Sequence, residues 1–598
     1  MGSSNLLLYC FVLASALLAN AGSSITGAPA TACPVPLPNL LSHRAVGPDS
    51  LTPRIQKALD SLDQYLKKRT TADDLDSLSI AVVTPAGPIF TRGYGLLKAN
   101  DTSSKDVPDK DSIYRLGSIS KMFTVFETLL LREKGALSLD DPADKYLAGF
   151  TTPDAEYKWA DALSARAPKP QDGLTGPSSK VTLRQLATHT SGLQRDYPVN
   201  YLQEWPSSNW TSTPAGPLAL EKVVADLAKN PLVNLPNSVP VYSNVGFGLL
   251  GLANIVANAK SKGAAGATEP KTHKELIQRD IFDVFGLKSS FFRAPEDPAV
   301  RARLAVSSKN PIWANSLLGD VEDPAGGQYG SISDLAEIAK AFLSPTAPAN
   351  EYKFLPTLVR EWLRPAHLFA SGNSAVGAPW EISYISASTP GSTTGPSSTI
   401  VPVYSKSGDL GDYHNLFSLN PEYGYAVVVL TTGSANPDEF ADEAFQALQP
   451  AFHDALANQV SSSYVGKWGG SGNSAETKLI DGQLFLTQLT VNGSDVLKIL
   501  QEKRLLVKDT KQAVRPVALW STGRLDEFRM SLGRPGARAP NRQAFLSCLP
   551  YWATVDFGVG SRGAPLDLVY WENGGLVYPS AGVGFKKSLS RRTFFKKA

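Results

Sequence analysis

Hydrophobic side chains recur with a helical period along much of the chain. Thr52-Pro53 provides a helix N-cap and first-turn pair, and the apolar positions that follow share one face, which predicts a helix to about Lys68. The same periodicity predicts further helices over Lys121–Lys134, Leu183–His189, Leu218–Lys229, Gly246–Ala259, Lys271–Phe285, Ser331–Phe342 and Asp438–Asn458. The middle of the chain is therefore expected to be mostly helical.

Strand patterns flank this helical middle. Leu78–Thr84 and Ile89–Tyr94 enclose Pro85-Ala-Gly-Pro88, which is typical of an antiparallel hairpin. Further strands are predicted at Val401–Lys406, Asp412–Ser418 and Tyr423–Leu430. We therefore expect an α/β domain over residues 51–458, with one antiparallel sheet assembled from both ends and helices around it. Two loop-rich stretches, Ala165–Lys180 and Ser383–Thr399, are candidates for the border of a cleft.

The pattern changes from Val460 onward. Short apolar runs alternate with turn residues, and the runs are Lys478–Ile480, Leu484–Thr487, Val496–Leu500, Arg504–Val507 and Leu566–Trp571. This spacing predicts a small β-barrel or sandwich over residues 459–598. The chain has no internal repeat of 20 to 50 residues, which argues against a solenoid or propeller.

The N-terminus is typical of a secreted protein. An apolar run, Leu6–Leu18, precedes Ala19-Asn20-Ala21, so we expect a signal peptide over residues 1–21 and a Pro-rich lead-in over residues 22–50. A buried core helix is the alternative, but it would continue into helical sequence rather than into prolines. The sequons at Asn100, Asn209 and Asn492 agree with secretion. No later segment is apolar for long enough to span a membrane.

Composition excludes several classes of function. The 58 Lys and Arg nearly balance the 55 Asp and Glu, which gives a formal charge of +3 and argues against nucleic acid as a partner. The histidines and cysteines lack the spacing of zinc ligands, so we expect no metal and no cofactor. Cys10 would leave with the signal peptide, and Cys33 and Cys548 would then form a disulfide outside the cell; two free thiols are the alternative.

The first chemical motif is Gly117-Ser-Ile-Ser-Lys121, directly before an apolar helix. Positions i and i+3 share a helix face, so Lys121 can reach the Ser118 hydroxyl. Ser118 would also lie at the helix N-terminus, where free N–H groups favour a developing negative charge. This arrangement indicates a nucleophile beside a base, although about three such S-x-x-K matches would arise by chance in a chain of this composition.

Two other motifs follow. Tyr242-Ser-Asn244 precedes a predicted helix and can direct a phenol and an amide into one cleft; an Asn N-cap after a surface Tyr is the alternative. Lys406-Ser407-Gly408 ends a strand that we expect at the sheet edge, where unpaired N–H groups are available and the glycine lets a substrate approach.

In this order, the three motifs resemble the signature of the serine β-lactamase and penicillin-binding-protein superfamily. Val181–Leu193 and Pro324–Leu335 resemble stretches of its class C-like branch. The chain is most similar to secreted fungal β-lactamase-like proteins that add a C-terminal β domain. The resemblance implies a β-lactamase/transpeptidase-like fold, with an antiparallel sheet flanked by helices and an all-helical subdomain.

The resemblance also implies roles for individual residues. Ser118 would be the acylated nucleophile, Lys121 would accept or relay its proton, and Tyr242 would act as second base and then as acid. Lys406 would lower the pKa of Tyr242. The other implied site residues are Asn244, Ser407 and Gly408 at the substrate, and the backbone N–H groups of Ser118 and Asp409 at the oxyanion.

Some positions depart from the branch or lie outside its roles. The branch often has His at Lys406 and Thr at Ser407, and the residues here keep a charge and a hydroxyl. The Asp409 carboxylate would repel a substrate carboxylate unless its side chain turns away, which argues against penicillins. His189 is expected to be structural, and His414 a side chain on a strand face.

The motifs together predict a secreted serine hydrolase or acyltransferase that cleaves or transfers an ester, amide or lactam acyl group. Its substrate would be a small molecule or a peptide, and the motifs do not separate hydrolysis from transfer. A biosynthetic tailoring enzyme that uses the same cleft is one alternative, and a non-catalytic binding protein is the other. The oligomeric state is left open.

Overall fold

The protein is described by a computed structural model in which two compact units are distinguished. The structure describes residues 35–152, 180–197, 219–228, 231–346, 353–386, 400–480, 482–504, 516–532, 552 and 555–588. The larger unit contains the described residues from 39 to 459, and the smaller contains those from 460 onward together with residues 35–38.

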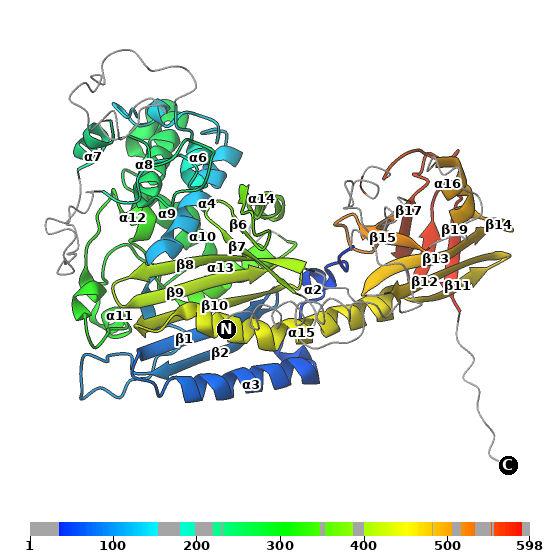
Figure 1. The fold of residues 1–598 in the computed structure, drawn as a ribbon, viewed down its shortest axis with the longest axis horizontal. Coiled ribbons are helices and arrows are strands. Elements are labelled where there is room, and N and C mark those ends of the chain that lie inside the picture. The colour runs from blue at the N-terminus through cyan, green and yellow to red at the C-terminus, as the bar shows by residue number, and fades with distance from the viewer. Residues whose placement is uncertain are drawn as a thin grey trace, which may run out of the picture. The chain divides into compact units, whose positions relative to one another are not determined.

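The larger unit is built on an antiparallel sheet with the strand order β2-β1-β10-β9-β8-β7-β6-β5 (Figure 1). Its strands are β1 (Leu75–Thr84), β2 (Gly87–Gly95), β5 (His367–Leu368), β6 (Ser374–Val376), β7 (Glu381–Ser386), β8 (Ile400–Leu410), β9 (Tyr413–Asn420) and β10 (Tyr425–Gly433). A separate pair consists of β3 (Ile113–Arg115) and β4 (Tyr329–Ser331). The neighbouring strands β1 and β10 come from opposite ends of this unit, as the sequence predicts.

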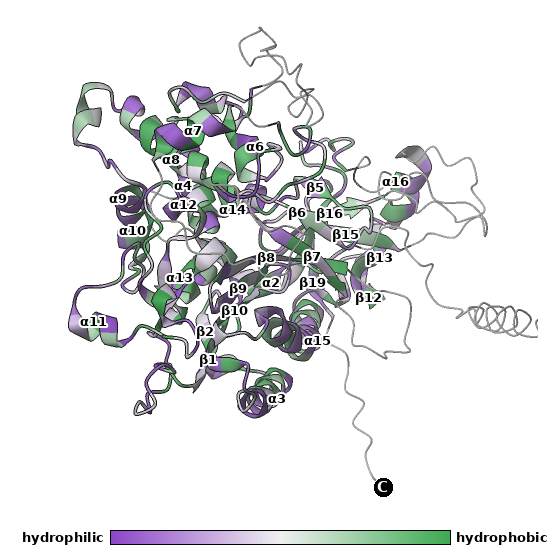
Figure 2. Cartoon of the chain, turned by 60° about the vertical axis from the view of Figure 1, so that its left-hand side comes forward, coloured by the Kyte–Doolittle hydropathy of each residue, from purple (hydrophilic) through white to green (hydrophobic). Residues whose placement is uncertain are grey.

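Helices cover both faces of the sheet and form a helical region beside it. They are α2 (Leu40–His43), α3 (Pro53–Arg69), α4 (Ser120–Glu133), α6 (Leu183–Ala187), α7 (Leu220–Leu227), α8 (Asn244–Ser261), α9 (His273–Ile277), α10 (Asp283–Phe285), α11 (Pro298–Ala302), α12 (Asp323–Gly326), α13 (Ile332–Leu343), α14 (Leu355–Trp362) and α15 (Pro437–Tyr464). Helices α3 and α15 lie side by side, and an ion pair between Arg69 and Glu439 joins them (Figure 1). Figure 2 shows hydrophobic and hydrophilic residues on both, as expected for helices with one buried face.

Helix α4 lies at the centre of the helical region. Every side chain from Ser120 to Leu131 is buried, because α4 packs against α8 and α12, and Phe126 packs against Phe342 of α13 and Trp362 of α14. Most of these buried side chains are apolar, as expected in a core, and this placement fixes the residues at the helix N-terminus. Short turns complete the unit: η1 (Pro48–Ser50), η2 (Gly117–Ile119), η3 (Ala143–Lys145), η5 (Gly263–Thr268), the π-helical η6 (Gln278–Phe282) and η7 (Pro311–Asn315).

The smaller unit is a closed barrel. Its sheet runs β12-β11-β19-β18-β17-β16-β15-β13-β14, and an additional pairing of β12 with β13 closes a ring of eight strands. The elements are β11 (Gly466–Gly470), β12 (Asn473–Ile480), β13 (Gln483–Val491), β14 (Ser494–Asp495), α16 (Val496–Arg504), β15 (Val517–Ser521), β16 (Glu527–Ser531), β17 (Leu568–Glu572), β18 (Gly575–Tyr578) and β19 (Val583–Lys587). The predicted fold class is confirmed, and of the two predicted forms of the β domain the barrel is correct.

Three predictions about individual elements were wrong. Val496–Leu500, expected as a strand, begins helix α16, because Gln501, Glu502 and Lys503 continue the run with good helix formers. The helix predicted to reach His189 ends at Ala187, since His189 adopts a φ of 60°. Strand β7 extends three residues past Ser383, into the stretch expected to be a loop.

Several predictions lie outside the described residues. These are the signal peptide, residues 22–34 of the lead-in, Cys33, Cys548, Asn209 and nearly all of the Ala165–Lys180 loop. Asn100 and Asn492 are described, and both are exposed in turns. Among the described helices, none has the length and apolar character that crossing a membrane requires.

Candidate active site

Ser118 lies in the 3₁₀ turn η2, two residues before helix α4 begins. The turn depends on Gly117, whose φ of 54° is rarely adopted by residues with a side chain. Gly117 and Ile119 are buried, whereas the Ser118 side chain is partly exposed. The sequence therefore places one hydroxyl at the open end of an otherwise buried segment.

Lys121 lies one helical turn further along, and it is completely buried. Its Nζ donates hydrogen bonds to Ser118 Oγ at 2.9 Å, Asn244 Oδ1 at 2.6 Å and the Ala325 carbonyl oxygen at 2.6 Å. Burial lowers the pKa of Lys121 to about 8, and the positive charge of Lys406 acts in the same direction. The ammonium is thus positioned beside the hydroxyl and loses its proton more easily than an exposed lysine.

Tyr242 lies between the two lysines. Lys121 Nζ is 4.9 Å and Lys406 Nζ 5.3 Å from the centroid of its ring. Burial opposes ionisation of the phenol, but the two cations outweigh it and hold the pKa of Tyr242 below its usual value of 10, with a hydrogen bond to Ser118 contributing. The arrangement favours a phenolate within reach of the Ser118 hydroxyl.

Helix α8 begins two residues after Tyr242, and its N-cap differs from the alternative weighed from the sequence. Ser243, not Asn244, is the N-cap residue, and its hydroxyl accepts a hydrogen bond from the Gly246 N–H. Asn244 is the first helical residue. Its Oδ1 accepts the hydrogen bond from Lys121 Nζ, and its Nδ2 donates a hydrogen bond to Asp196 Oδ1 at 2.5 Å. The Asn244 side chain is therefore free of capping duty and faces the site.

Lys406 is completely buried on β8, where it contacts a carboxylate that the motifs did not indicate. Its Nζ donates to Glu381 Oε1 at 2.5 Å and to the Ser407 carbonyl oxygen at 2.7 Å. Burial disfavours the ammonium, but the charges of Glu381 and of an ionised Tyr242 outweigh it and raise the pKa of Lys406. Lys406 therefore remains a cation over a wider pH range than Lys121.

Strand β8 is not the edge strand that the sequence suggested, since β5, β6 and β7 lie beyond it. However, β7 begins at Glu381, opposite Ser405, so the part of β8 from Lys406 to Leu410 extends past its neighbour. In this overhang, residues 406–410 of β8 have no β7 residue opposite them, so one side of the strand is unpaired there although β8 lies within the sheet. The Ser407 N–H on that side is occupied by Glu381 Oε2 at 2.8 Å.

The overhang packs against the turn that carries Ser118. A Cβ on Gly408 would lie 2.0 Å from the Leu116 carbonyl oxygen, and a Cβ on Gly117 would lie 2.8 Å from the Asp409 nitrogen. Gly408 thus allows close approach of another chain segment, which is a structural reason for glycine besides the expected access for substrate. The contact brings the Asp409 N–H beside the backbone of the nucleophile, as an oxyanion hole requires.

The Asp409 side chain turns toward the neighbouring strand. Its Oδ1 lies 2.7 Å from Nδ1 of His414, the residue paired with it on β9. The Asp409 side chain is 66% exposed. His414 thus lies on the strand face, and the pair directs part of the acidic charge away from Ser118.

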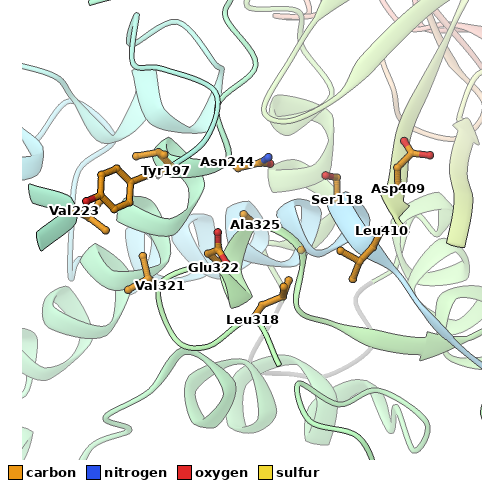
Figure 3. Close-up of a pocket in the computed structure, with 12 residues that line it drawn as sticks. Ser118, Tyr197, Val223, Asn244, Leu318, Val321, Glu322, Ala325, Asp409 and Leu410 are labelled. Carbon is orange, nitrogen blue, oxygen red and sulfur yellow. The ribbon is translucent and has the colours of Figure 1, made fainter. Parts of the chain in front are cut away.

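A pocket opens beside Ser118 and encloses about 640 Å³, including the part open to solvent. Figure 3 shows Ser118 and Asp409 at one end and Tyr197 with Val223 at the other. Much of the lining is apolar, and it includes Tyr197, Val223, Val245, Leu318, Val321 and Leu410. Glu322 also lines the pocket; burial, together with the charges of Asp196 and Asp323, raises the pKa of its carboxyl to about 7. The pocket can therefore hold an apolar group of a substrate, and the Glu322 carboxyl would lie beside that group.

The structure brings together the predicted residues from all three motifs, and it adds three that the motifs missed: Asp196, Glu322 and Glu381. Glu322 lies two residues before Pro324–Leu335, one of the stretches that resemble the class C-like branch. The sequence therefore indicated this part of the chain, although not Glu322 itself. No local signal marked Asp196 or Glu381, which reach the site through loop and strand packing. Within the described residues, no group of His, Cys, Asp or Glu side chains has the arrangement of a metal site.

The chain matches one family model and several known proteins. A family model described as "Beta-lactamase" matches residues 62–451, which include every candidate residue from Ser118 to Asp409. "Beta-lactamase-like protein str6" of Strobilurus tenacellus is 35% identical over 323 residues, 52% of this chain and 98% of that protein. "Beta-lactamase-like protein" of Arthroderma benhamiae is 25% identical over 464 residues, 75% of this chain and 70% of that protein. "D-alanyl-D-alanine-carboxypeptidase/endopeptidase AmpH" of Escherichia coli is 25% identical over 287 residues, 48% of this chain and 62% of that protein.

Proposed function

The chain belongs to the beta-lactamase family of serine hydrolases, and from this premise we propose that it cleaves an ester, amide or lactam through an acyl intermediate on Ser118. One observation carries the proposal: Lys121 Nζ lies 2.9 Å from Ser118 Oγ, and the Tyr242 ring lies between Lys121 and Lys406. A nucleophile, a base and the charges that tune the base are therefore in direct contact.

In the acylation step, Ser118 Oγ forms a bond to the acyl carbon. Its proton passes, directly or through Lys121, to the Tyr242 phenolate. The N–H groups of Ser118 and Asp409 would hold the developing oxyanion. When the bond to the leaving group breaks, the Tyr242 phenol returns the proton to the leaving atom, so the step is balanced and leaves Tyr242 as it began.

Deacylation repeats the step with an external nucleophile. Water attacks the acyl carbon, Tyr242 takes its proton and then returns a proton to Ser118 Oγ, which leaves as the hydroxyl. If an alcohol or amine enters in place of water, the acyl group is transferred instead. The apolar lining of the pocket supports an acyl group with an apolar part, such as an aliphatic or aromatic chain.

Intact-protein mass spectrometry tests the proposal. The protein is incubated with a panel of activated esters and β-lactams, and the mass of one acyl group is expected on wild type and not on Ser118→Ala. Ser120→Ala is a useful control, because Ser120 is buried with its hydroxyl donating to the Gly117 carbonyl oxygen and is no nucleophile. Acylation of Ser118→Ala, or no acylation of a folded wild type by any member of the panel, would contradict the proposal and favour a binding protein.

A second measurement separates hydrolysis from transfer. Product analysis is repeated with rising concentrations of a primary alcohol and a primary amine beside water. A hydrolase gives the free acid throughout, whereas an acyltransferase gives a growing share of the transferred product. The transferase outcome would favour the alternative of a biosynthetic tailoring enzyme.

We also propose that the protein is secreted, with its leader removed after Ala21 and with sugar on exposed sequons. The apolar run and small-residue site support the leader, and the exposure of Asn100 and Asn492 supports modification. N-terminal sequencing of protein from a culture medium tests the cleavage. Peptide mapping without reduction tests the Cys33–Cys548 disulfide, since finding both residues alkylated would refute it.

A further inference from the structure

The corner formed by Lys406 and Ser407 binds a carboxylate that belongs to the chain itself. Glu381 Oε1 accepts hydrogen bonds from Lys406 Nζ at 2.5 Å and from Ser407 Oγ at 3.0 Å. Glu381 Oε2 accepts one from the Ser407 N–H at 2.8 Å. An ammonium, a hydroxyl and a strand N–H thus converge on the two oxygens of one anion, as in a binding site for carboxylates.

This corner adjoins the reacting atoms. Lys406 Nζ is 5.3 Å from the centre of the Tyr242 ring, and Tyr242 contacts the Ser118 hydroxyl. A substrate acylating Ser118 would therefore present the atoms next to its scissile bond to Lys406 and Ser407. Because Lys406 is completely buried, it cannot turn to meet a second anion elsewhere.

Glu381 is held in this position by the fold. It is the first residue of β7 and pairs with Ser405, so its side chain reaches the overhang of β8. The preceding residue, Trp380, is completely buried and packs against Trp362, with ring centroids 5.1 Å apart. The start of β7 is thus anchored in the core, and the carboxylate is delivered to the corner by a rigid element.

Two other cations lie beside Tyr242: Lys121 Nζ is 4.9 Å and the Arg195 guanidinium carbon 4.8 Å from the centre of its ring, whereas at the corner Lys406 is already paired with Glu381. Burial raises the pKa of Asp438, and the negative charges of Asp442, Glu381 and Asp409 act in the same direction, so several acids lie near this corner. The Glu381 side chain is itself 39% exposed, so a substrate approaching the corner meets it directly. A second carboxylate would find Lys406 already neutralised and three acids beside it.

We propose that Glu381 determines specificity by occupying the carboxylate site of Lys406 and Ser407, so that the enzyme selects acyl substrates with no carboxylate beside the scissile bond. The inference rests on the proposed function, since it names the substrate class of the same site. It also implies that removing Glu381 uncovers a working site for carboxylates.

A matched pair of substrates tests this in kinetic terms. The probes are the chromogenic cephalosporin nitrocefin, which carries a carboxylate beside the lactam, and its methyl ester. We expect wild type to prefer the ester, and Glu381→Ala to shift the ratio of kcat/KM for acid over ester at least tenfold toward the acid. Taking the ratio within each protein removes any change in general reactivity. Glu381→Gln, which keeps the size and removes the charge, should shift the ratio in the same direction.

Asp438→Asn is the control for charge alone. It removes one negative charge near the corner but lies at the start of α15, where its backbone N–H donates a hydrogen bond to Asn436 Oδ1. Its ratio should stay within about twofold of wild type. A ratio unchanged in both Glu381 variants would overturn the proposal, and an equal shift in Asp438→Asn would overturn it too, since bulk charge would then explain the effect.

Binding to inactive protein keeps this test separate from the proposed function. Equilibrium dialysis compares nitrocefin binding to Ser118→Ala and to Ser118→Ala with Glu381→Ala. We expect binding at least tenfold tighter in the double variant, and equal affinities would overturn the proposal. If the proposed function fails, wild type shows no acylation by any ester, whereas this difference in binding is still measured.

Discussion

His189 stacks on Tyr242, with ring centroids 4.5 Å apart and an angle of 23° between the planes. Its Nδ1 accepts a hydrogen bond from the Ser243 N–H at 3.0 Å, which fixes the backbone beside the phenol. Burial lowers the pKa of His189 well below 6.5, and the charges of Lys121 and Lys406 act in the same direction, so the ring is neutral. His189 is therefore a positioning residue that holds Tyr242 from one side.

Two substitutions at His189 should separate its two contacts. His189→Ala loses both the ring and the acceptor, so we expect kcat to fall at least tenfold and the free energy of unfolding to fall by about 1–3 kcal/mol. His189→Asn keeps an acceptor and tolerates the φ of 60°, so it should retain most of the stability while kcat still falls. Steady-state kinetics and urea unfolding measure the two effects. His367→Ala, on strand β5, is the control, and an unchanged kcat in His189→Ala would refute the positioning role.

The pH profile should depend on Tyr242 and both lysines as one unit. The rate should rise as the phenol loses its proton and fall near pH 8 as Lys121 loses the charge that supports the phenolate. Lys406→Ala removes a cation that lowers both pKa values, and it leaves Glu381 uncompensated. We therefore expect a lower kcat and a working range shifted to higher pH.

Tyr242→Phe tests the base itself. The loss of a general base should lower the rate by about 10² to 10⁴. Both variants and wild type are measured as kcat/KM against pH on one activated ester. An unchanged rate in Tyr242→Phe would assign the base role to Lys121 alone, and a profile that does not move in Lys406→Ala would show that the groups titrate independently.

Gly408→Ala should disturb both stability and rate. The added Cβ would lie 2.0 Å from the Leu116 carbonyl oxygen, which forces β8 away from the turn that carries Ser118. We expect a loss of about 1–3 kcal/mol in the free energy of unfolding and a larger fall in kcat than in KM. Gly584→Ala is the matched control, because a Cβ there meets no atom within 4 Å. Wild-type kinetics in Gly408→Ala would contradict the close contact.

Glu322 should make stability depend on pH. Burial raises the pKa of Glu322 to about 7 from 4.5, so the folded protein holds this proton more tightly than the unfolded chain. Its favourable contribution is complete below about pH 4.5 and is lost as the pH rises through about 7. Relative to wild type, Glu322→Gln should therefore gain about 1–3 kcal/mol in unfolding free energy between pH 5 and pH 8. Glu337→Gln, exposed on α13, should show no such gain, and parallel curves for Glu322→Gln would disprove the burial effect.

The chemistry of the site is local in the sequence, and for that reason the sequence predicts it. Ser118 and Lys121 are brought together by one helical turn, and Tyr242 and Asn244 flank Ser243, the N-cap residue of α8. Glu381 is different, because it reaches Lys406 only through the register that pairs it with Ser405. Register between distant strands is set by the whole sheet, so no local pattern announces this contact.

The misassigned elements have a similar cause. Strand β7, the neighbour of β8, runs into the Ser383–Thr399 stretch that was expected to be a loop, and β5 and β6 contain only two and three residues, too few to show an alternating pattern. For this reason the sequence suggested that β8 is the edge of the sheet. The neighbouring strands β1 and β10 were easier to predict, since both are long and buried on both faces. Long apolar strands are defined by their own composition, whereas short edge strands depend on their neighbours.

The contact between the Leu116–Gly117 segment and the Gly408–Asp409 segment has a consequence for how such an enzyme could acquire new substrates. Two stretches of main chain touch with no side chain between them, so the spacing of nucleophile and oxyanion donor is independent of most substitutions. The pocket walls are made by side chains, among them Val223, Leu318 and Val321. Protein engineers could therefore diversify the walls in a combinatorial library while the reactive machinery stays intact, because selectivity and reactivity are encoded in separable parts of the chain.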